Sequence, residues 1–209
     1  MSRALIVTGT DTGIGKTVIA AALVHALDAG YWKPVQAGLE DETDREAVIR
    51  LARLPEDRAY PEAYRLKLPA SPHFAAAEEG VLISPARLTP PGHDGLLVIE
   101  GAGGVLVPLS EPLLYADMFA QWRAPVVLVA RTALGTINHS LLSIEALRAR
   151  NVPIAGIAFV GDAMPDTERT ICAIGQVRRL GRLPHLDRLS CDTLHPAFAE
   201  GFDLSELRL

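Results

Sequence analysis

The sequence predicts an α/β fold in which a mostly parallel β-sheet is covered by helices on both faces. Short apolar runs recur along the chain, helical apolar patterns separate them, and glycine-rich or carboxylate-bearing loops follow two of the runs. Such alternation is typical of parallel strands joined by right-handed crossovers, with ligands bound at the carboxyl ends of the strands. No Pro/Gly-rich linker or low-complexity tract divides the 209 residues, so we expect a single domain over residues 1–209.

A glycine-rich loop over residues 9–17, GTDTGIGKT, follows a predicted strand at residues 4–7 and precedes a predicted helix at residues 16–29. A loop ending Gly-Lys-Thr at a helix N-terminus presents backbone N–H groups and the Lys16 ammonium to phosphate oxygens, and the Thr17 hydroxyl to Mg²⁺. The alternative is a connection that only turns the chain. We expect a P-loop NTPase-like fold whose nucleotide-binding residues here are Thr10, Asp11, Thr12, Gly13, Ile14, Gly15, Lys16 and Thr17.

A second candidate for metal binding is Glu100, which ends the apolar run at residues 95–99. Small residues follow it at positions 101–104, as expected where a buried parallel strand meets a ligand-facing loop. In phosphate-loop NTPases a carboxylate at this place holds Mg²⁺ beside the hydroxyl of the loop. A capping or turn carboxylate is the structural alternative.

The other elements follow from hydrophobic periodicity and from turn residues. We expect strands at residues 31–35, 124–130, 154–160 and 180–186, the last turning at Pro184, and a turn at residues 36–38. We expect helices over residues 44–52, from Ser71 to Gly80, around residues 137–147, over residues 166–177, and in a short tail. Residues 55–70 read as irregular.

Composition limits the partners that the chain can have. The net charge is −5, and Lys and Arg are spread along the sequence, which argues against binding to nucleic acid or to an anionic membrane. Met1-Ser2-Arg3 leads directly into the first apolar run and no run is long enough to span a bilayer, so we expect a cytoplasmic protein. Cys172 and Cys191 have no metal-binding spacing and predict neither a zinc site nor a disulfide.

Several motifs together resemble the dethiobiotin synthetase family. After GTDTGIGKT come YWKPVQAG, SPH, EGAGG, VPLS, ALGTINHSLLS and LGRLPHL, in order from Val7 to Leu186. The loop of that family also has five residues between its two glycines, as between Gly9 and Gly15 here. The resemblance implies an ATP- and Mg²⁺-dependent ring closure, the penultimate step of biotin synthesis. In it, 7,8-diaminononanoate and CO₂ become dethiobiotin through an N-carbamate and a carbamic-phosphoric anhydride, with release of ADP and phosphate.

The resemblance also assigns roles to residues. Lys16, Lys33 and Thr12 are the implied catalytic residues, with Lys16 on the phosphates, Lys33 on the carbamate and the transferred phosphate, and Thr12 on the diamine. Thr17, Asp44 and Glu100 are the implied Mg²⁺ ligands. The nucleotide set is extended by Asp162, Pro184, His185 and Leu186. The implied substrate-binding residues are Thr12, Lys33, Ala37, Ser71, Pro72, Gly103, Gly104, Gly135, Thr136 and Asn138.

The residues alone leave alternatives at two of these positions. A lone lysine before a proline is ordinarily a solvated side chain, and only the match of YWKPVQAG gives Lys33 its role. Asp44 lies in a run of acids, so a shifted alignment would exchange it for Asp41, Glu42 or Glu46.

The helix start at residues 135–138 offers free N–H groups that can receive the distal carboxylate of the substrate. The resemblance implies that the neighbouring subunit holds this carboxylate, and therefore a homodimer with its active site at the interface. The local alternative is a plain helix cap by Thr136 or Asn138. His73 is as able to pack as to bind.

Two positions depart from the family pattern. Ala37 replaces a small hydroxyl residue, and residues 159–162 lack the asparagine that reads adenine, so either Asp162 accepts from the adenine amino group or base selectivity is loose. A ParA- or MinD-like ATPase is the leading rival, but its loop carries an additional lysine where this chain has Asp11. The ligase portion of a glutamine-dependent amidating enzyme is a second rival. It would need an ammonia-producing domain, for which the 209 residues leave no room, or a separate glutaminase subunit.

Overall fold

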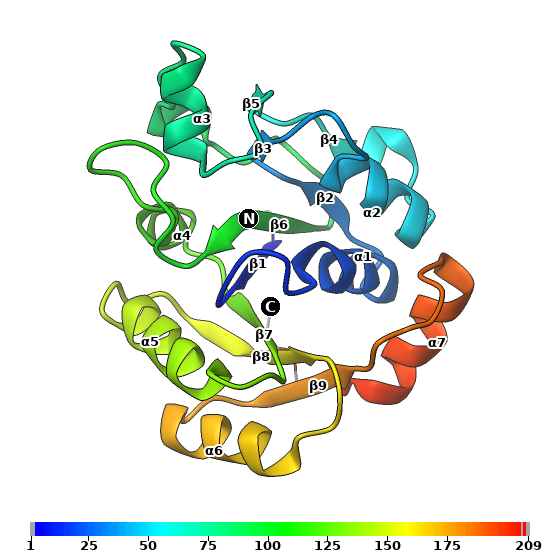
Figure 1. The fold of residues 1–209 in the computed structure, drawn as a ribbon. Coiled ribbons are helices and arrows are strands. Elements are labelled where there is room, and N and C mark those ends of the chain that lie inside the picture. Colours follow the sequence, from blue (N-terminus) through cyan, green and yellow to red (C-terminus); the bar gives the residue numbers. More distant parts are fainter. Residues whose placement is uncertain (1–2, 206, 208–209) are drawn as a thin grey trace.

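The computed structural model describes residues 3–205 and 207, and its centre is a parallel β-sheet (Figure 1). The strands are β1 Arg3–Gly9, β2 Gly30–Trp32, β3 Val35–Ala37, β4 Ala59–Tyr60, β5 Tyr64–Leu66, β6 Leu96–Gly104, β7 Val126–Arg131, β8 Ile154–Val160 and β9 Arg179–Leu183. The main sheet has seven strands in the order β4-β2-β6-β1-β7-β8-β9, and β3 pairs with β5 in a small second sheet. Of the predicted domain over residues 1–209, residues 1–2, 206 and 208–209 lie outside this description.

Helices cover both faces of the main sheet, as predicted (Figure 1). They are α1 Lys16–Ala26, α2 Asp44–Ala52, α3 Pro72–Glu78, α4 Tyr115–Trp122, α5 Thr136–Arg148, α6 Pro165–Gly175 and α7 Cys191–Gly201, with 3-10 turns at Glu56–Arg58 and Pro85–Arg87. One hydrophobic cluster joins the sheet to α1, α2 and α7, and a second joins its other face to α3, α4, α5 and α6. Among the described residues, no helix has the length and apolar character needed to cross a membrane.

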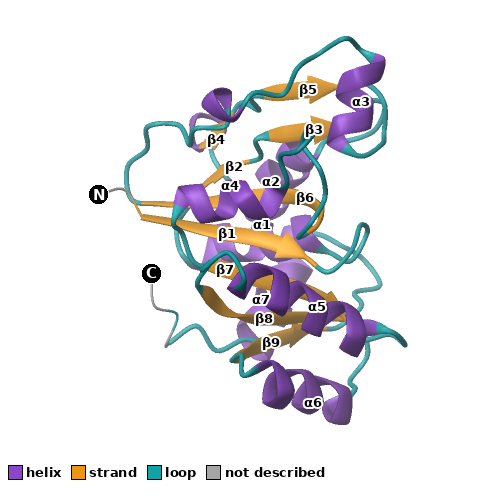
Figure 2. Cartoon of the chain, turned by 90° about the vertical axis from the view of Figure 1, so that its left-hand side faces the viewer, coloured by secondary structure: helices purple, strands orange, loops and turns teal. Residues whose placement is uncertain are grey.

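Strand β1 lies at the centre of the main sheet. The chain first adds strands on one side of β1 and then, from β7 on, on the other side. Strand β1 pairs in parallel with β6 on one side and with β7 on the other, and the strands that follow β7 extend the sheet away from β6. The carboxyl ends of these strands meet at one edge (Figure 2). Ligands bind parallel α/β sheets at this kind of switch point, and the glycine-rich loop begins there, directly after β1.

The predicted strand at residues 31–35 is two strands in the structure. β2 ends at Trp32 in the main sheet and β3 begins at Val35 in the small sheet, so the turn predicted at residues 36–38 is largely strand. Pro34 lies at the break because its nitrogen has no hydrogen to donate to a strand ladder. Lys33 therefore lies where the chain leaves the main sheet, beside Glu100 and Gly101 of β6.

Other differences concern the ends of elements. Helix α1 ends at Ala26 and Asp28 has a φ of 48°, a left-handed conformation that does not continue a helix. Strand β6 continues to Gly104, whose partner is Gly9, so residues 101–104 are strand and not loop. Helix α4 lies in a stretch for which the pattern predicted no element. Strand β9 ends at Leu183, before Pro184.

Candidate active site

The glycine-rich loop closes over the carboxyl end of β1 and leads into α1. Gly15 stands directly before the helix with a φ of 96°, in the left-handed region that glycine adopts without strain. A Cβ on Gly9 would lie 2.5 Å from Ile14 Cδ1, so a larger residue at the start of the loop would displace the Ile14 side chain. Lys16 is buried, its Nζ donates to the Asp11 carbonyl oxygen at 2.6 Å, and burial lowers its pKa to about 8.

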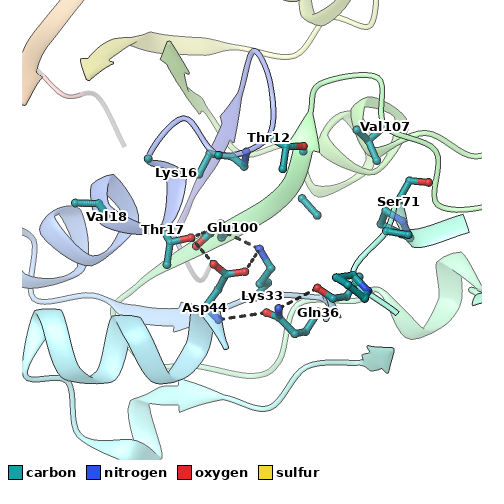
Figure 3. Close-up of a pocket in the computed structure, with 18 residues that line it drawn as sticks. Thr12, Lys16, Thr17, Val18, Lys33, Gln36, Asp44, Ser71, Glu100 and Val107 are labelled. Atoms are coloured by element: carbon teal, nitrogen blue, oxygen red, sulfur yellow. Dashed lines mark hydrogen bonds and ion pairs between the residues drawn. The ribbon is translucent and has the colours of Figure 1, made fainter. Parts of the chain in front are cut away.

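Four side chains converge beside the loop: Thr17, Lys33, Asp44 and Glu100 (Figure 3). Lys33 Nζ lies 2.9 Å from Asp44 Oδ2 and 3.2 Å from Glu100 Oε1. The Thr17 hydroxyl donates within the same cluster, to Asp44 Oδ1 and to Glu100 Oε1. The predicted metal ligands and the predicted catalytic lysine therefore form one contiguous polar cluster, although they come from four separate elements or connections.

Burial strengthens the electrostatics of this cluster because it excludes water. Burial alone would lower the pKa of Lys33, but the charges of Glu100 and Asp44 outweigh it and raise that pKa above its ordinary value. Burial alone would likewise raise the pKa of Asp44, but the Lys33 ammonium and the Thr17 hydroxyl lower it. Tyr31 donates to Glu100 Oε2 at 2.7 Å. In this arrangement Lys33 carries a positive charge between two carboxylates.

The local structure of α2 selects Asp44 from the neighbouring acids. Thr43 and Glu46 form a capping box, which turns Glu46 back to the start of the helix. Glu42 forms a bidentate pair with the exposed Arg50. Asp44 is the first residue of the helix, its carboxylate reaches Lys33 and Thr17, and Gln36 Oε1 accepts from its backbone N–H at 3.3 Å.

A cavity of about 650 Å³ adjoins this cluster. The predicted site residues that line it are Thr12, Gly13, Gly15, Lys16, Thr17, Lys33, Ala37, Asp44, Ser71, Pro72, Glu100 and Gly103. His73 does not line it, and its Nδ1 is buried without a hydrogen-bond partner among the described residues. The cavity therefore has residues of the glycine-rich loop on one wall and Ser71 and Pro72 on another.

A second cavity of about 550 Å³ continues from the other side of the loop and shares Gly13, Gly15 and Val18 with the first. The predicted nucleotide-binding residues that line it are Gly13, Ile14, Gly15, Asp162, Pro184, His185 and Leu186. Because it is continuous with the phosphate loop and lies over the ends of β8 and β9, this second cavity has the position expected for a nucleoside attached to phosphates on the loop.

The remaining predicted residues lie elsewhere. Thr10, Asp11 and Gly104 line a third cavity of about 460 Å³, on the side that faces α5. None of the three cavities is lined by Gly135, Thr136 or Asn138. Among the described residues, no side chain caps the start of α5. The alternative of a helix cap by Thr136 or Asn138 is therefore wrong. The Thr136 hydroxyl is buried and has no hydrogen-bond partner within the described part of the chain.

Some residues of the site were not predicted. Gln36 is buried, orients the backbone of Asp44, and donates to the carbonyls of Ala37 and Gly38. Tyr31 supports Glu100, and Val107 completes the wall of the first cavity. Gln36 lies within the YWKPVQAG motif, and this motif is the sequence feature from which its role could have been predicted. Tyr31 offered no such feature, because a tyrosine in a short apolar strand reads as core.

The donor set of the cluster suits a small, hard cation. Within residues 3–205 and 207, no three His, Cys, Asp or Glu side chains form a metal-binding group. The cluster instead brings together two carboxylates, of Asp44 and Glu100, and the hydroxyl of Thr17. Mg²⁺ prefers such oxygen ligands and completes its coordination with phosphate oxygens and water. The ammonium of Lys33 already occupies a position between the carboxylates, so this environment accommodates positive charge.

The fold of this chain is similar to that of known nucleotide-binding proteins. A family model described as AAA domain matches residues 3–193. A ParA family ATPase from Chlorobium tepidum superposes with a TM-score of 0.50 at 14% identity, covering 97% of this chain and 91% of that one. The MinC:MinD cell division complex of Aquifex aeolicus gives a TM-score of 0.54 at 14% identity, covering 94% of this chain and 86% of that one. The fold and the loop together define a P-loop NTPase-like α/β protein.

Sequence relatives narrow this class. A protein of Rhodopseudomonas palustris (strain BisA53) is 63% identical over 206 residues, covering 99% of this chain and 97% of that protein. A protein of Rhizorhabdus wittichii (strain RW1) is 65% identical over 202 residues, covering 97% of each. A protein of Brucella ovis is 59% identical over 206 residues, covering 99% of this chain and 97% of that protein. All three are named ATP-dependent dethiobiotin synthetase, and the present chain belongs to this family.

Proposed function

We propose that this protein uses ATP and Mg²⁺ to convert 7,8-diaminononanoate and CO₂ into dethiobiotin. One amine of the substrate attacks CO₂ and loses a proton, which gives an N-carbamate. A carbamate oxygen then attacks the γ-phosphorus, and ADP leaves. Finally the second amine attacks the carbamate carbon of the mixed anhydride and loses a proton as phosphate leaves, which closes the ring and forms the C–N bond of a cyclo-ligase.

In this proposal the side chains act by position and charge and not as nucleophiles. Lys16 leaves the Asp11 carbonyl and binds the β- and γ-phosphates, and the positive charge of Lys33 stabilises the carbamate and the transferred phosphoryl group. Thr12 contacts the diamine, and Ala37, Ser71, Pro72 and Gly103 shape its site, with Gly104 in the neighbouring third cavity. Phosphoryl transfer requires mainly such charge neutralisation and in-line positioning.

Thr17, Asp44 and Glu100 would hold Mg²⁺, which supplies positive charge beside the phosphate oxygens. Tyr31 keeps one Glu100 oxygen engaged, and Gln36 holds the backbone of Asp44. Both contacts restrict the carboxylates before any ligand arrives. Such preorganisation reduces the cost of ordering the site when the nucleotide binds.

The second cavity is the proposed nucleoside site, with Asp162, Pro184, His185 and Leu186 around the base. In the absence of an asparagine, Asp162 is the proposed acceptor for the adenine amino group. Support comes from the continuity of this cavity with the cluster through Gly13, Gly15 and Val18.

We further propose a homodimer in which residues 135–138 of one subunit bind the distal substrate carboxylate of the other. Two observations support it. The start of α5 lines no cavity of its own chain among those described above. Large apolar side chains are exposed nearby, with relative accessibilities of 104% for Leu134, which directly precedes Gly135, and of 56% for Leu142 and 49% for Leu106, which line the third cavity. Exposed apolar patches of this kind mark protein interfaces.

The observation that carries the proposal is the cluster of Thr17, Lys33, Asp44 and Glu100 beside a phosphate loop in a chain of this family. The test is to incubate the purified protein with diaminononanoate, labelled bicarbonate, Mg²⁺ and ATP. The expected result is an acid-stable labelled product formed one for one with phosphate. If no acid-stable product appeared and phosphate release did not depend on the diamine, the proposal would be wrong.

A further inference from the structure

The nucleoside end of the site is bordered by a loop that joins β8 to α6. We call residues 161–164 the base-side loop. Gly161 and Asp162 of this loop line the second cavity, whereas Met164 stands directly before α6. The position of Asp162 at the cavity edge therefore depends on how the backbone of Gly161 is held.

The path of the backbone at Gly161 is narrowly determined. Its φ is 122°, a conformation that residues with a Cβ rarely adopt, and a Cβ at this position would lie 2.5 Å from Thr132 Oγ1, so any side chain here would strain the loop. Its N–H donates to the Leu183 carbonyl oxygen at 2.9 Å. Its carbonyl oxygen accepts from Arg182 Nη1, also at 2.9 Å. Two consecutive residues of β9 thus hold both backbone polar groups of Gly161.

The same guanidinium contacts a buried carboxylate at the other end of the base-side loop. Arg182 Nε lies 3.5 Å from Glu168 Oε1, and this oxygen also accepts from the Met164 backbone N–H at 3.4 Å. Glu168 is 4% exposed, and its second oxygen accepts from Arg179 Nε at 2.7 Å. Because a buried carboxylate needs charged partners, Glu168 and Arg182 hold each other in place. Arg182 therefore connects both ends of the loop.

We propose that Arg182 is a positioning residue that sets the affinity and the base selectivity of the nucleotide site. It lines neither the first nor the second cavity, and it acts through the Gly161 carbonyl, which holds Asp162 at the edge of the second cavity. This inference rests on the proposed function in taking the second cavity as the nucleoside site and Asp162 as the residue that contacts the base. Without Arg182 the loop loses its link to Glu168 and Asp162 moves relative to the base.

Arg179 provides a matched control for this role. Its guanidinium also pairs with Glu168, from the same strand, but it makes no contact with the base-side loop among those the structure records. In Arg182→Met, Glu168 keeps Arg179 and the Met164 N–H, and in Arg179→Met it keeps Arg182 and the same N–H. Each variant therefore leaves the buried carboxylate with one cationic partner.

The experiment measures dissociation constants of ATP, GTP and CTP by calorimetry for the wild type and both variants, with melting temperatures and ATP steady-state kinetics alongside. For Arg182→Met we expect an ATP dissociation constant about tenfold higher, a similar rise in KM, kcat within about twofold of the wild type, and a smaller preference for ATP over GTP. For Arg179→Met we expect nucleotide constants within about twofold of the wild type.

Equal ATP affinities of the wild type and Arg182→Met would overturn the inference, as would equal losses in the two variants, which would make the network merely structural. If Arg182→Met did not fold, Arg182→Lys would decide, because one ammonium cannot reproduce the two-armed contact with Glu168 and Gly161. Unchanged nucleotide affinity in that variant also overturns the inference. Failure of the wild type to bind any nucleotide would instead refute the proposed function.

Discussion

The Lys33 ammonium and the Asp44 carboxylate form a 2.9 Å ion pair at the entrance to the phosphate loop. Lys33 is also 3.2 Å from Glu100, so one cation is shared by two proposed metal ligands. A metal ion bound to both carboxylates would compete with this ammonium. We therefore expect the Lys33 ammonium to turn toward the substrate when Mg²⁺ and nucleotide bind. Binding of Mg²⁺ and nucleotide would then also position the charge that stabilises the carbamate.

The first prediction concerns Lys33→Gln. Removal of one partner from a buried pair leaves uncompensated charge, so we expect the metal-free variant to lose about 3–5 kcal/mol of unfolding free energy. Mg²⁺ should restore more stability to the variant than to the wild type, because it no longer competes with an ammonium. Urea unfolding with and without Mg²⁺ measures both effects, and product formation should be abolished while ATP binding persists.

Arg50→Gln is the matched control, since it breaks an exposed ion pair with Glu42 on the same helix as Asp44. Such pairs contribute up to about 1 kcal/mol, so the loss should be small and independent of Mg²⁺. If ATP affinity collapsed in Lys33→Gln, then Lys33 would belong to the nucleotide site and the assigned role would be incorrect.

The second prediction compares Thr17→Val with Thr17→Ser. Valine keeps the shape of threonine but removes the hydroxyl that contacts Asp44 and Glu100, whereas serine retains the hydroxyl. We expect the Mg²⁺ concentration for half-maximal activity to rise about tenfold or more in Thr17→Val and to change little in Thr17→Ser. Metal titrations of turnover test this, and equal behaviour of the two variants would exclude Thr17 as a metal ligand.

The third prediction concerns the proposed homodimer. Leu142 is 56% exposed on α5 and lines the third cavity, and a glutamate there places a charge on the exposed apolar face proposed as the interface. Leu142→Glu should shift the protein from dimer to monomer in sedimentation experiments and raise the KM for the diamine. Leu82→Glu, at an 80% exposed position outside this face, should remain dimeric. A wild-type protein that sediments as a monomer at all concentrations would disprove the dimer.

The fourth prediction concerns pH and the packing of α7 on α1. The rings of His25 and His195 are stacked 3.4 Å apart, and Cys191, Arg53 and Asp192 also face His195. Burial, and next the charge of His25, lower the pKa of His195 below 6.5. The unfolded state therefore binds more protons than the folded state just below this pH, so stability falls as the pH drops through that region.

His195→Phe keeps a ring on His25 and removes the titration. Its melting temperature should fall less between pH 7.5 and pH 5.5 than that of the wild type. If the melting temperatures of the two proteins fell equally between pH 7.5 and pH 5.5, His195 would not contribute to the acid sensitivity.

The structure confirms the predicted α/β class, because that class follows from local patterns. Apolar runs such as residues 95–99 are typical of buried parallel strands. A loop ending in Gly-Lys-Thr before a helix, as at residues 15–17, is typical of phosphate binding. What sequence alone could not predict was the break at Pro34, which divides one apparent strand between two sheets. That break depends on β5, a short strand whose partner is known only after folding.

The sequence by itself determined the family, the phosphate loop and the candidate residues, because these depend on residue type and spacing along the chain. Only the tertiary structure decided which of several acids faces Lys33, that Glu46 caps α2 while Asp44 turns inward, and that Arg182 holds Gly161. The physical reason is that side-chain partners are chosen by burial and distance between elements far apart in the chain. Thr17 and Glu100 meet only because β1 pairs with β6.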